Sequence, residues 1–336
     1  MVSGKKRGNM IFNEIIGQEI IINALKNSIT GSTVGHAFIF SGPKGIGKKT
    51  VAGIFASTLL CENRKGFDAC GVCMSCQLRE NGTNPDFHII EPFNPSISVE
   101  EIRNLQDGIC IKPLYSSRKV YIIYESDRMT LQAQNCLLKT LEEPPAYTVI
   151  ILTTDNYETL LPTIRSRAVR YDFKKNTHDE VRAFLDREFG GDIKNKDFLV
   201  SYCDGVIGKT LEISASFLTV RDALADIIIK LGNRKTADVF EMYDFFEANR
   251  EDIDLLLNFM VLFYRDFLVL KKTGNENMLI NSDKKDIILN NVSAFSTREI
   301  VRNIELIEQS RRYLKQNANY QLTVEVMLMK LQEEIF

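Results

Sequence analysis

The fold is indicated by one stretch of the chain, residues 36–49, which read HAFIFSGPKGIGKK. The first half is a short apolar run typical of a buried strand, and the second half is a glycine-rich turn leading into a helical pattern. The turn fits seven positions of the phosphate-binding loop G-x-x-x-x-G-K-[ST], whose backbone N–H groups wrap a phosphate. The candidate phosphate ligands are Gly42, Gly45, Gly47 and Lys48, whose ammonium would reach the terminal phosphates.

Strand and helix patterns alternate on both sides of this loop. Further strands are predicted at residues 87–90, 120–124, 149–153 and 169–173, and helices at 19–28, 48–60, 99–110 and 133–141. Short strands that are apolar throughout indicate a parallel sheet covered by helices on both faces. After residue 173 the strand signals end, and helical patterns continue, with short helices predicted at 178–189 and 196–203. We therefore predict three parts: an α/β domain over 1–173, a small helical unit over 174–212 and a helical domain over 213–336.

The composition is that of an ordinary globular chain. Of 336 residues, 44% are hydrophobic and 26% are charged. Lys and Arg number 42 and Asp and Glu 44, a net charge of −2, which argues against an autonomous, strongly basic nucleic-acid binder. No apolar run approaches the roughly 18 residues that span a bilayer, and no apolar signal region follows the basic residues 1–9. We expect a cytoplasmic protein with no membrane association.

Four of the seven cysteines form a cluster in the sequence. Cys61, Cys70, Cys73 and Cys76 have the spacing C-x8-C-x2-C-x2-C, and each C-x2-C turn delivers two thiolates to one side of a metal ion. Four soft ligands predict a structural zinc site, because no coordination position is left for a reacting water. The other three cysteines lie in apolar settings and are expected in the core: Cys110, Cys136 and Cys203.

The nucleotide motif departs from its pattern at the positions that hold Mg²⁺. Lys49 replaces the Ser or Thr of the loop, and Thr50 follows one residue late, about 100° round the helix. At the end of the strand at 120–124, Tyr124 replaces the metal-binding acid, although Glu125 is retained. Two changes that both remove Mg²⁺ ligands predict weak or absent ATP hydrolysis. Whether Lys49 still holds phosphate without a metal is left open.

Four segments and the four-cysteine insert follow one another along the chain. They are 12–18 (FNEIIGQ), 36–42 (HAFIFSG), the insert at 61–76, 135–145 (NCLLKTLEEPP) and 163–167 (TIRSR). In this order they resemble the bacterial clamp-loader members of the AAA+ superfamily, over roughly the first 210 residues. Residues 318–331 (ANYQLTVEVMLMKL) look like the family's last collar helix. The resemblance implies an α/β AAA+ P-loop domain with a zinc module at about 61–76, a helical lid and an all-α collar for oligomerisation.

Within this family, two kinds of subunit carry the zinc module: an ATP-hydrolysing motor and a stator with a degenerate nucleotide site. Lys49 and Tyr124 match the stator pattern, as does Lys209 where the motor has a nucleotide-sensing arginine. The resemblance implies a DNA polymerase III subunit in a heteropentamer with the motor subunits and the delta subunit, which loads the sliding clamp onto primed DNA. It implies zinc as a structural ion and no Mg-ATP chemistry in this chain.

Two further candidate site residues depend on the same resemblance. Residues 165–168 (RSRA) resemble the family's Ser-Arg-Cys motif, with alanine in place of the cysteine, and imply that Arg167 is an arginine finger for a neighbouring subunit's ATP site. Arg165 is the nearby alternative, and a local salt bridge of Arg167 is the alternative without a functional role. Thr154 matches the polar sensor position at a strand end.

Two other functions remain open from the sequence. A motor subunit with an unusual loop would show Mg²⁺-dependent ATP binding and would form homo-oligomers. A nucleic-acid binder would use the zinc module, but the basic residues around it are few, and no aromatic platform lies among them (Arg64, Lys65 and Arg79).

Overall fold

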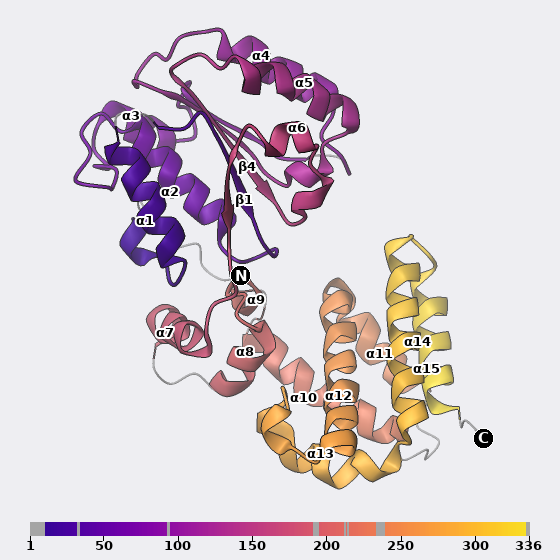
Figure 1. The fold of residues 1–336 in the computed structure, drawn as a ribbon. Coiled ribbons are helices and arrows are strands. Elements are labelled where there is room, and N and C mark those ends of the chain that lie inside the picture. The colour runs from indigo at the N-terminus through magenta and orange to yellow at the C-terminus, as the bar shows by residue number, and fades with distance from the viewer. Residues whose placement is uncertain are drawn as a thin grey trace. The chain divides into compact units, whose positions relative to one another are not determined.

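Residues 37–41 form β1, an inner strand of a five-stranded sheet in a computed structural model of the chain (Figure 1). The strands are all parallel and run in the order β2-β3-β4-β1-β5. Their bounds are β1 (Ala37–Ser41), β2 (Phe87–Ile90), β3 (Lys119–Ile123), β4 (Thr148–Thr154) and β5 (Val169–Asp172). Since β1 pairs with both β4 and β5, the glycine-rich loop leaves the carboxyl edge of the sheet with a strand on either side.

The structure describes residues 11–31, 34–92, 95–190, 195–211, 213, 215–232 and 239–333. The chain divides into two units, Met1–Asp192 with Cys203–Lys209, and Ile193–Tyr202 with Thr210–Phe336. The first unit holds the whole sheet, and the second is built of helices. The predicted division at residues 173 and 212 stays a prediction.

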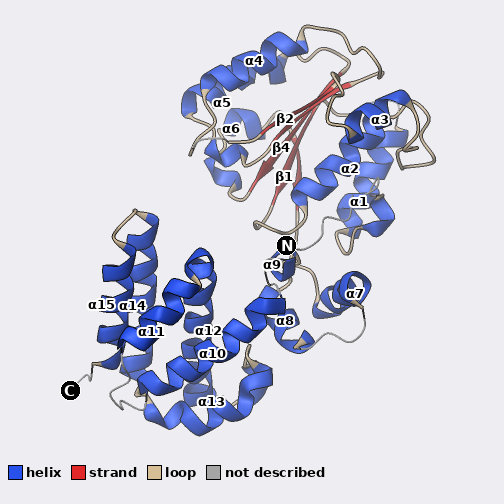
Figure 2. Ribbon diagram, turned by 180° about the vertical axis from the view of Figure 1, so that it is seen from behind, coloured by secondary structure: helices blue, strands red, loops and turns tan. Residues whose placement is uncertain are grey.

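Helices cover both faces of the sheet, as Figures 1 and 2 show. One core lies under α1 (Glu19–Thr30) and α2 (Lys48–Leu60), and the other under α4 (Val99–Ile109) and α5 (Leu131–Glu142). Side chains of β1 alternate between the two, because successive residues of a strand point to opposite faces. Phe38 and Phe40 enter the first core, and Ala37 and Ile39 the second. The predicted parallel sheet with helices on both faces is confirmed.

Local sequence explains where several helices begin. Ser98 and Thr177 accept hydrogen bonds from the N–H groups of Glu101 and Glu180, whose carboxylates bind back, so both helix starts are capping boxes. These open α4 and α7 (His178–Phe189). Helix α5 ends directly before Pro144 and Pro145, which lack the N–H that a helix needs. The predicted bounds of these helices agree with the observed ones to within two residues.

Within the described residues, the second unit contains helices joined by turns and loops, and no strand. Its helices are α8 (Lys196–Cys203), α10 (Ala215–Gly232), α11 (Val239–Ala248), α12 (Ile253–Thr273), α13 (Lys285–Asn291), α14 (Thr297–Lys315) and α15 (Tyr320–Gln332), and α9 (Gly208–Leu211) spans the division between the units. Helix α12 packs against α10, α13 and α14, and α15 packs against α11 and α14. In the described residues, no helix has the length and apolar character that crossing a membrane would require.

A buried arginine joins two segments of this unit. The Arg221 guanidinium on α10 has no exposed surface and binds both carboxylate oxygens of Asp283 at 2.8 Å. It donates to Asn281 Oδ1 at 2.7 Å and lies 3.6 Å from the ring centroid of Phe198. The charge is therefore paired and hydrogen-bonded, as a buried charge must be.

Two features differ from the sequence-based expectation. The cysteine insert contains a helix, α3 (Met74–Glu80), that the hydrophobic pattern did not indicate, because its seven residues are too few to show a period. Cys110 is exposed at the end of α4, so the prediction of a core cysteine there was wrong. Cys136 is half-buried and Cys203 is buried.

Candidate functional site

The glycine-rich loop requires glycine at three positions because of its backbone conformation. Gly42, Gly45 and Gly47 have φ values of 151°, 83° and 105°, a region that residues with a Cβ rarely occupy. A Cβ at Gly42 would lie 2.8 Å from the carbonyl oxygen of Phe173. On the other side, the N–H of Gly208 donates to the carbonyl of Gly45 at 2.9 Å. The loop is thus enclosed between the end of β5 and the start of α9.

Lys48 is bound by the loop itself. Its ammonium donates to the carbonyl oxygens of Gly42 at 2.6 Å and Pro43 at 2.9 Å, and to Asp155 Oδ1 at 2.8 Å. A lysine ammonium has three donors, so these three acceptors satisfy all of them. The side chain is 6% exposed. A phosphate could bind Lys48 only by displacing one of these partners.

Lys49 lies against the group that replaces the metal-binding acid. Its ammonium is 3.2 Å from Glu125 Oε1, 3.6 Å from Glu91 Oε1 and 4.6 Å from the ring centroid of Tyr124. Tyr124 is buried, and burial together with the Glu91 carboxylate raises the pKa of its phenol, so it supplies no anionic oxygen at neutral pH. The retained carboxylate therefore faces an internal cation. Thr50 is half-buried on the next position of α2.

The remaining polar groups at the carboxyl edge bind one another. The Thr154 hydroxyl is 3.0 Å from Asp127 Oδ1 and 2.9 Å from the carbonyl of Asn156. The N–H of Asp155 donates to the same Asp127 oxygen at 3.2 Å. Sequence reasoning missed the roles of Asp127 and Asp155. The available signal was that both follow neighbouring strands at the edge where parallel strands end.

Arg167 makes the local salt bridge that the sequence left as an alternative. Its Nη2 is 2.8 Å from Glu142 Oε1, and its Nη1 donates to the carbonyl of Thr163 at 2.9 Å. Arg165, at the end of α6 (Pro162–Arg165), pairs with Glu158. Both arginines thus have local partners within the described residues.

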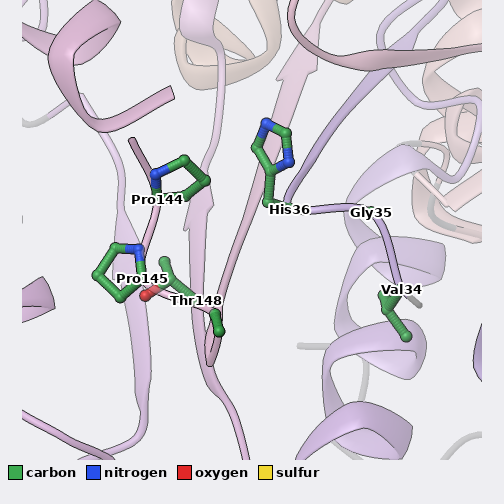
Figure 3. Close-up of a pocket in the computed structure, with 7 residues that line it drawn as sticks. Val34, Gly35, His36, Pro144, Pro145 and Thr148 are labelled. Atoms are coloured by element: carbon green, nitrogen blue, oxygen red, sulfur yellow. The ribbon is translucent and has the colours of Figure 1, made fainter. Parts of the chain in front are cut away.

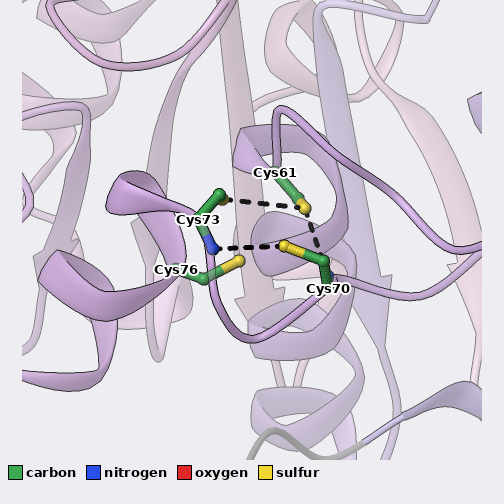
Figure 4. Close-up of side chains that lie close together, drawn as sticks. All are labelled: Cys61, Cys70, Cys73 and Cys76. Carbon is green, nitrogen blue, oxygen red and sulfur yellow. Dashed lines mark hydrogen bonds between the residues drawn. The ribbon is translucent and has the colours of Figure 1, made fainter.

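The four clustered cysteines converge, as Figure 4 shows. Cys61 follows the end of α2, Cys76 lies in α3, and all four Sγ atoms lie within 4.8 Å of one another. The Sγ atoms of Cys61 and Cys73 are 4.0 Å apart. Four thiolates about 2.3 Å from a tetrahedral zinc ion lie about 3.8 Å apart, so the donor set and its size fit zinc.

Backbone amides support the thiolates of this cluster. The N–H of Cys70 donates to Cys61 Sγ at 3.2 Å, and that of Cys73 donates to Cys70 Sγ at 3.3 Å. The N–H groups of Val72 and Cys73 lower the pKa of the Cys70 thiol to about 6. Burial raises the pKa of Cys61 and Cys76, which a bound cation would offset. The cluster is compatible with a structural zinc ion.

A pocket lies near the start of β1 and β4, and Figure 3 shows the residues that line it. It has a volume of about 400 Å³ and is lined by Val34, Gly35, His36, Pro144, Pro145, Ala146 and Thr148. His36 precedes β1 and Thr148 begins β4, so the pocket is at the amino-terminal ends of these strands. It is not part of the nucleotide site.

Comparisons with known proteins agree with this arrangement. Residues 17–177 match a family model described as DNA polymerase III, delta subunit, and residues 216–333 match its C-terminal counterpart. The chain is 30% identical to the DNA polymerase III subunit delta' of Bacillus subtilis, over 94% of this chain and 96% of that one. The chain belongs to the DNA polymerase III delta' family.

Proteins named as tau or gamma subunits are also similar to this delta' family member. The DNA polymerase III subunit tau of B. subtilis is 27% identical over 95% of this chain, which spans only 61% of the length of tau. A solved DNA polymerase III gamma subunit-related protein from Thermotoga maritima superposes with a TM-score of 0.56. It is 21% identical, covering 92% of this chain and 98% of that one, and it shows that the two proteins share a fold.

Proposed function

We propose that this delta' family member is the stator of a DNA polymerase III clamp loader, with a nucleotide site that does not hydrolyse ATP. Its partners are gamma/tau-type motor subunits and a delta subunit in a heteropentamer, and the complex loads the sliding clamp onto primed DNA. The observation that carries the proposal is the pairing of two lysines at the glycine-rich loop. Lys48 binds loop carbonyls and Asp155, and Lys49 pairs with Glu125.

Two contacts argue against Mg-ATP chemistry in this chain. Lys48 donates to two loop carbonyls and Asp155, and Lys49 pairs with Glu125, the carboxylate retained at the strand end. A Mg²⁺ ion prefers an octahedron of oxygen ligands, and with Lys49 and Tyr124 in place the loop hydroxyl and one strand-end carboxylate are lacking. We propose that Gly42, Gly45, Gly47, Lys48, Lys49, Thr50, Glu125 and Thr154 form an inherited, inactive nucleotide site.

Arg167 is the residue proposed to act on a neighbouring subunit. Its pair with Glu142 lies at the surface, with side chains 34% and 49% exposed. Exposed pairs contribute about 0–1 kcal/mol, so exchanging Glu142 for a phosphate costs little. A planar guanidinium binds phosphoryl oxygens with two parallel hydrogen bonds. Where measured, such fingers accelerate phosphoryl transfer by about 10³- to 10⁵-fold.

The experiment is single-turnover ATP hydrolysis by the reconstituted complex carrying Arg167→Ala. We expect assembly to be unchanged by gel filtration. The ATP bound at the site beside this subunit should hydrolyse on the order of 10³-fold more slowly. It should therefore remain unhydrolysed when the fast phase of the reaction is complete. Arg165→Ala is the matched control and should leave the fast phase complete. Unchanged hydrolysis in the Arg167→Ala complex contradicts the assignment, and loss with Arg165→Ala instead transfers it to Arg165.

A further inference from the structure

Two exposed apolar pairs lie next to each other beside the cysteine cluster. Val72 and Met74 flank the ligand position Cys73 and are 72% and 53% exposed. Leu114 and Tyr115, from the loop between α4 and β3, are 70% and 39% exposed. The hydroxyls of Ser75 and Ser116 are hydrogen-bonded at 2.8 Å. Met74 and Tyr115 each adjoin one of these serines, so the two exposed pairs lie on segments that touch at the surface.

Buried polar groups hold this surface in place. The buried carboxylate of Asp86 accepts hydrogen bonds from the N–H groups of Leu114 at 2.8 Å and Tyr115 at 2.7 Å. The Asn84 amide donates to the carbonyl of Ser75 at 2.9 Å. The segments under the apolar side chains are thus fixed in a conformation that leaves these side chains in water. Grouped exposed apolar side chains mark interaction sites in soluble proteins.

Unpaired positive charge borders the same surface. Arg118 ends the loop that carries Leu114, and Arg64 belongs to the cysteine insert. Burial and the nearby Arg64 charge both lower the pKa of Arg118. Among the described residues, Arg64, Lys65 and Arg118 make no ion pair.

Two carboxylates of the adjoining segments already accept backbone hydrogen bonds. Asp86 binds the loop amides, and Asp68 accepts a hydrogen bond from the N–H of Phe12 at 2.9 Å. Two guanidiniums that repel each other and make no ion pair among the described residues favour an external anion.

We propose that this surface, here called the zinc-module face, binds an acidic amphipathic polypeptide segment of a partner protein. It comprises Arg64, Val72, Met74, Leu114, Tyr115 and Arg118. Carboxylates of the segment would lie over the two arginines, and its apolar side chains over the two apolar pairs. The proposal does not depend on whether this chain hydrolyses ATP.

The arrangement favours a polypeptide over a nucleic acid. A phosphate backbone requires a continuous basic track, whereas four apolar side chains interrupt this one. Arg79, which could have extended the track, turns inward. It donates to the carbonyl of Gly53 at 3.0 Å and lies 5.2 Å from the ring centroid of Phe87.

The test is selection from a random 16-residue peptide library displayed on phage, with the full-length, zinc-loaded chain as bait. We expect selected peptides rich in Asp and Glu with interspersed aliphatic or aromatic residues, and micromolar Kd values when synthesised. Met74→Ser with Leu114→Ser, and separately Arg64→Glu, should each weaken binding at least about tenfold, or about 1.4 kcal/mol. Zinc content and circular dichroism verify that each variant is folded.

The matched control is Arg103→Glu with Leu131→Ser, an exposed pair on α4 and α5, and it should bind like the parent chain. The proposal is overturned if the selected peptides are not enriched in Asp and Glu. It is also overturned if they bind both variants as tightly as they bind the parent chain. Primed DNA is titrated in parallel. If Arg64→Glu weakens DNA binding and leaves peptide binding unchanged, the face belongs to a nucleic acid and the proposal is wrong.

Discussion

At the scale of single residues, the nucleotide site is characterised by the contacts of two lysine ammonium groups with nearby oxygen atoms. Lys48 and Lys49 are neighbours in sequence, yet one binds loop carbonyls and Asp155 and the other lies between Glu125 and Tyr124. An ammonium beside Glu125 provides part of the charge that Mg²⁺ would bring, without its open coordination positions. Lys49 and Tyr124 thus both alter the position beside Glu125 where a Mg²⁺ ion would bind.

Restoring both positions should restore nucleotide binding. We predict that Lys49→Thr with Tyr124→Asp binds Mg-ATP at least about tenfold more tightly than the parent chain, because it returns a hydroxyl and a carboxylate to the metal. Titration calorimetry of the isolated, zinc-loaded chain measures this. Each single variant is a control and should gain less. Micromolar Mg²⁺-dependent binding by the parent chain would contradict the stator function and favour the motor alternative.

At the scale of elements, we expect the cysteine insert to be stabilised mainly by its metal site. Cys61 and the other three cysteines lie on either side of a segment with few buried apolar side chains, so we expect the predicted metal to supply most of its order. The neighbouring α3 packs against α2, and Arg79 of α3 reaches the carbonyl of Gly53. Loss of the metal should therefore spread from the insert to α2.

We predict that protein purified without chelator contains one equivalent of zinc and that Cys73→Ser contains less than half an equivalent. Chelation or this substitution should raise amide hydrogen exchange in residues 61–80 and leave residues 239–333 unchanged. Cys110→Ser, an exposed cysteine outside the cluster, is the control and should retain the metal. Full protection of residues 61–80 after zinc removal would contradict a structural role.

The turn before α9 requires glycine at position 205. Gly205 has a φ of 75°, and a Cβ there would lie 2.4 Å from the carbonyl oxygen of Asn176. Because the obstruction is backbone, Gly205→Ala should lower the free energy of unfolding by about 2–4 kcal/mol. Gly31→Ala, whose Cβ would meet its nearest atom at 3.4 Å, should cost less than about 1 kcal/mol. Chemical denaturation measures both, and equal effects would refute the explanation.

At the scale of the whole molecule, the chain divides into two compact units, one that holds the sheet and one built of helices. Arg221 lies wholly in the second, where it joins α10 to the segment at Asn281 and Asp283. Removal of a buried, paired guanidinium leaves polar partners unsatisfied and a space over Phe198.

We predict that Arg221→Ala destabilises the second unit by about 3 kcal/mol and leaves the first unit unchanged. Hydrogen exchange resolved by peptide should show faster exchange in residues 253–315 and wild-type exchange in residues 37–60 and 148–173. Gly205→Ala is the reciprocal control, since its turn belongs to the first unit. Uniform acceleration across the chain in the Arg221→Ala protein would show that the units unfold as one.

Local sequence patterns predict those parts of this protein whose structure depends on a few neighbouring residues. The bounds of most strands and helices follow from side-chain periodicity, capping residues and prolines, which act over a few neighbouring positions. The glycine-rich loop and the C-x2-C turns are likewise local, because their chemistry requires fixed spacings.

Contacts between groups that lie far apart in the chain depend on the three-dimensional packing. Asp155 reaches Lys48 across 107 positions and Glu125 reaches Lys49 across 76, because parallel strands end at one edge of the sheet. The placement of β1 between β4 and β5, the pairing of Arg167 with Glu142 and the exposure of Cys110 depend on packing in the same way. No periodicity encodes such contacts, since they are set by which surfaces the whole chain buries together.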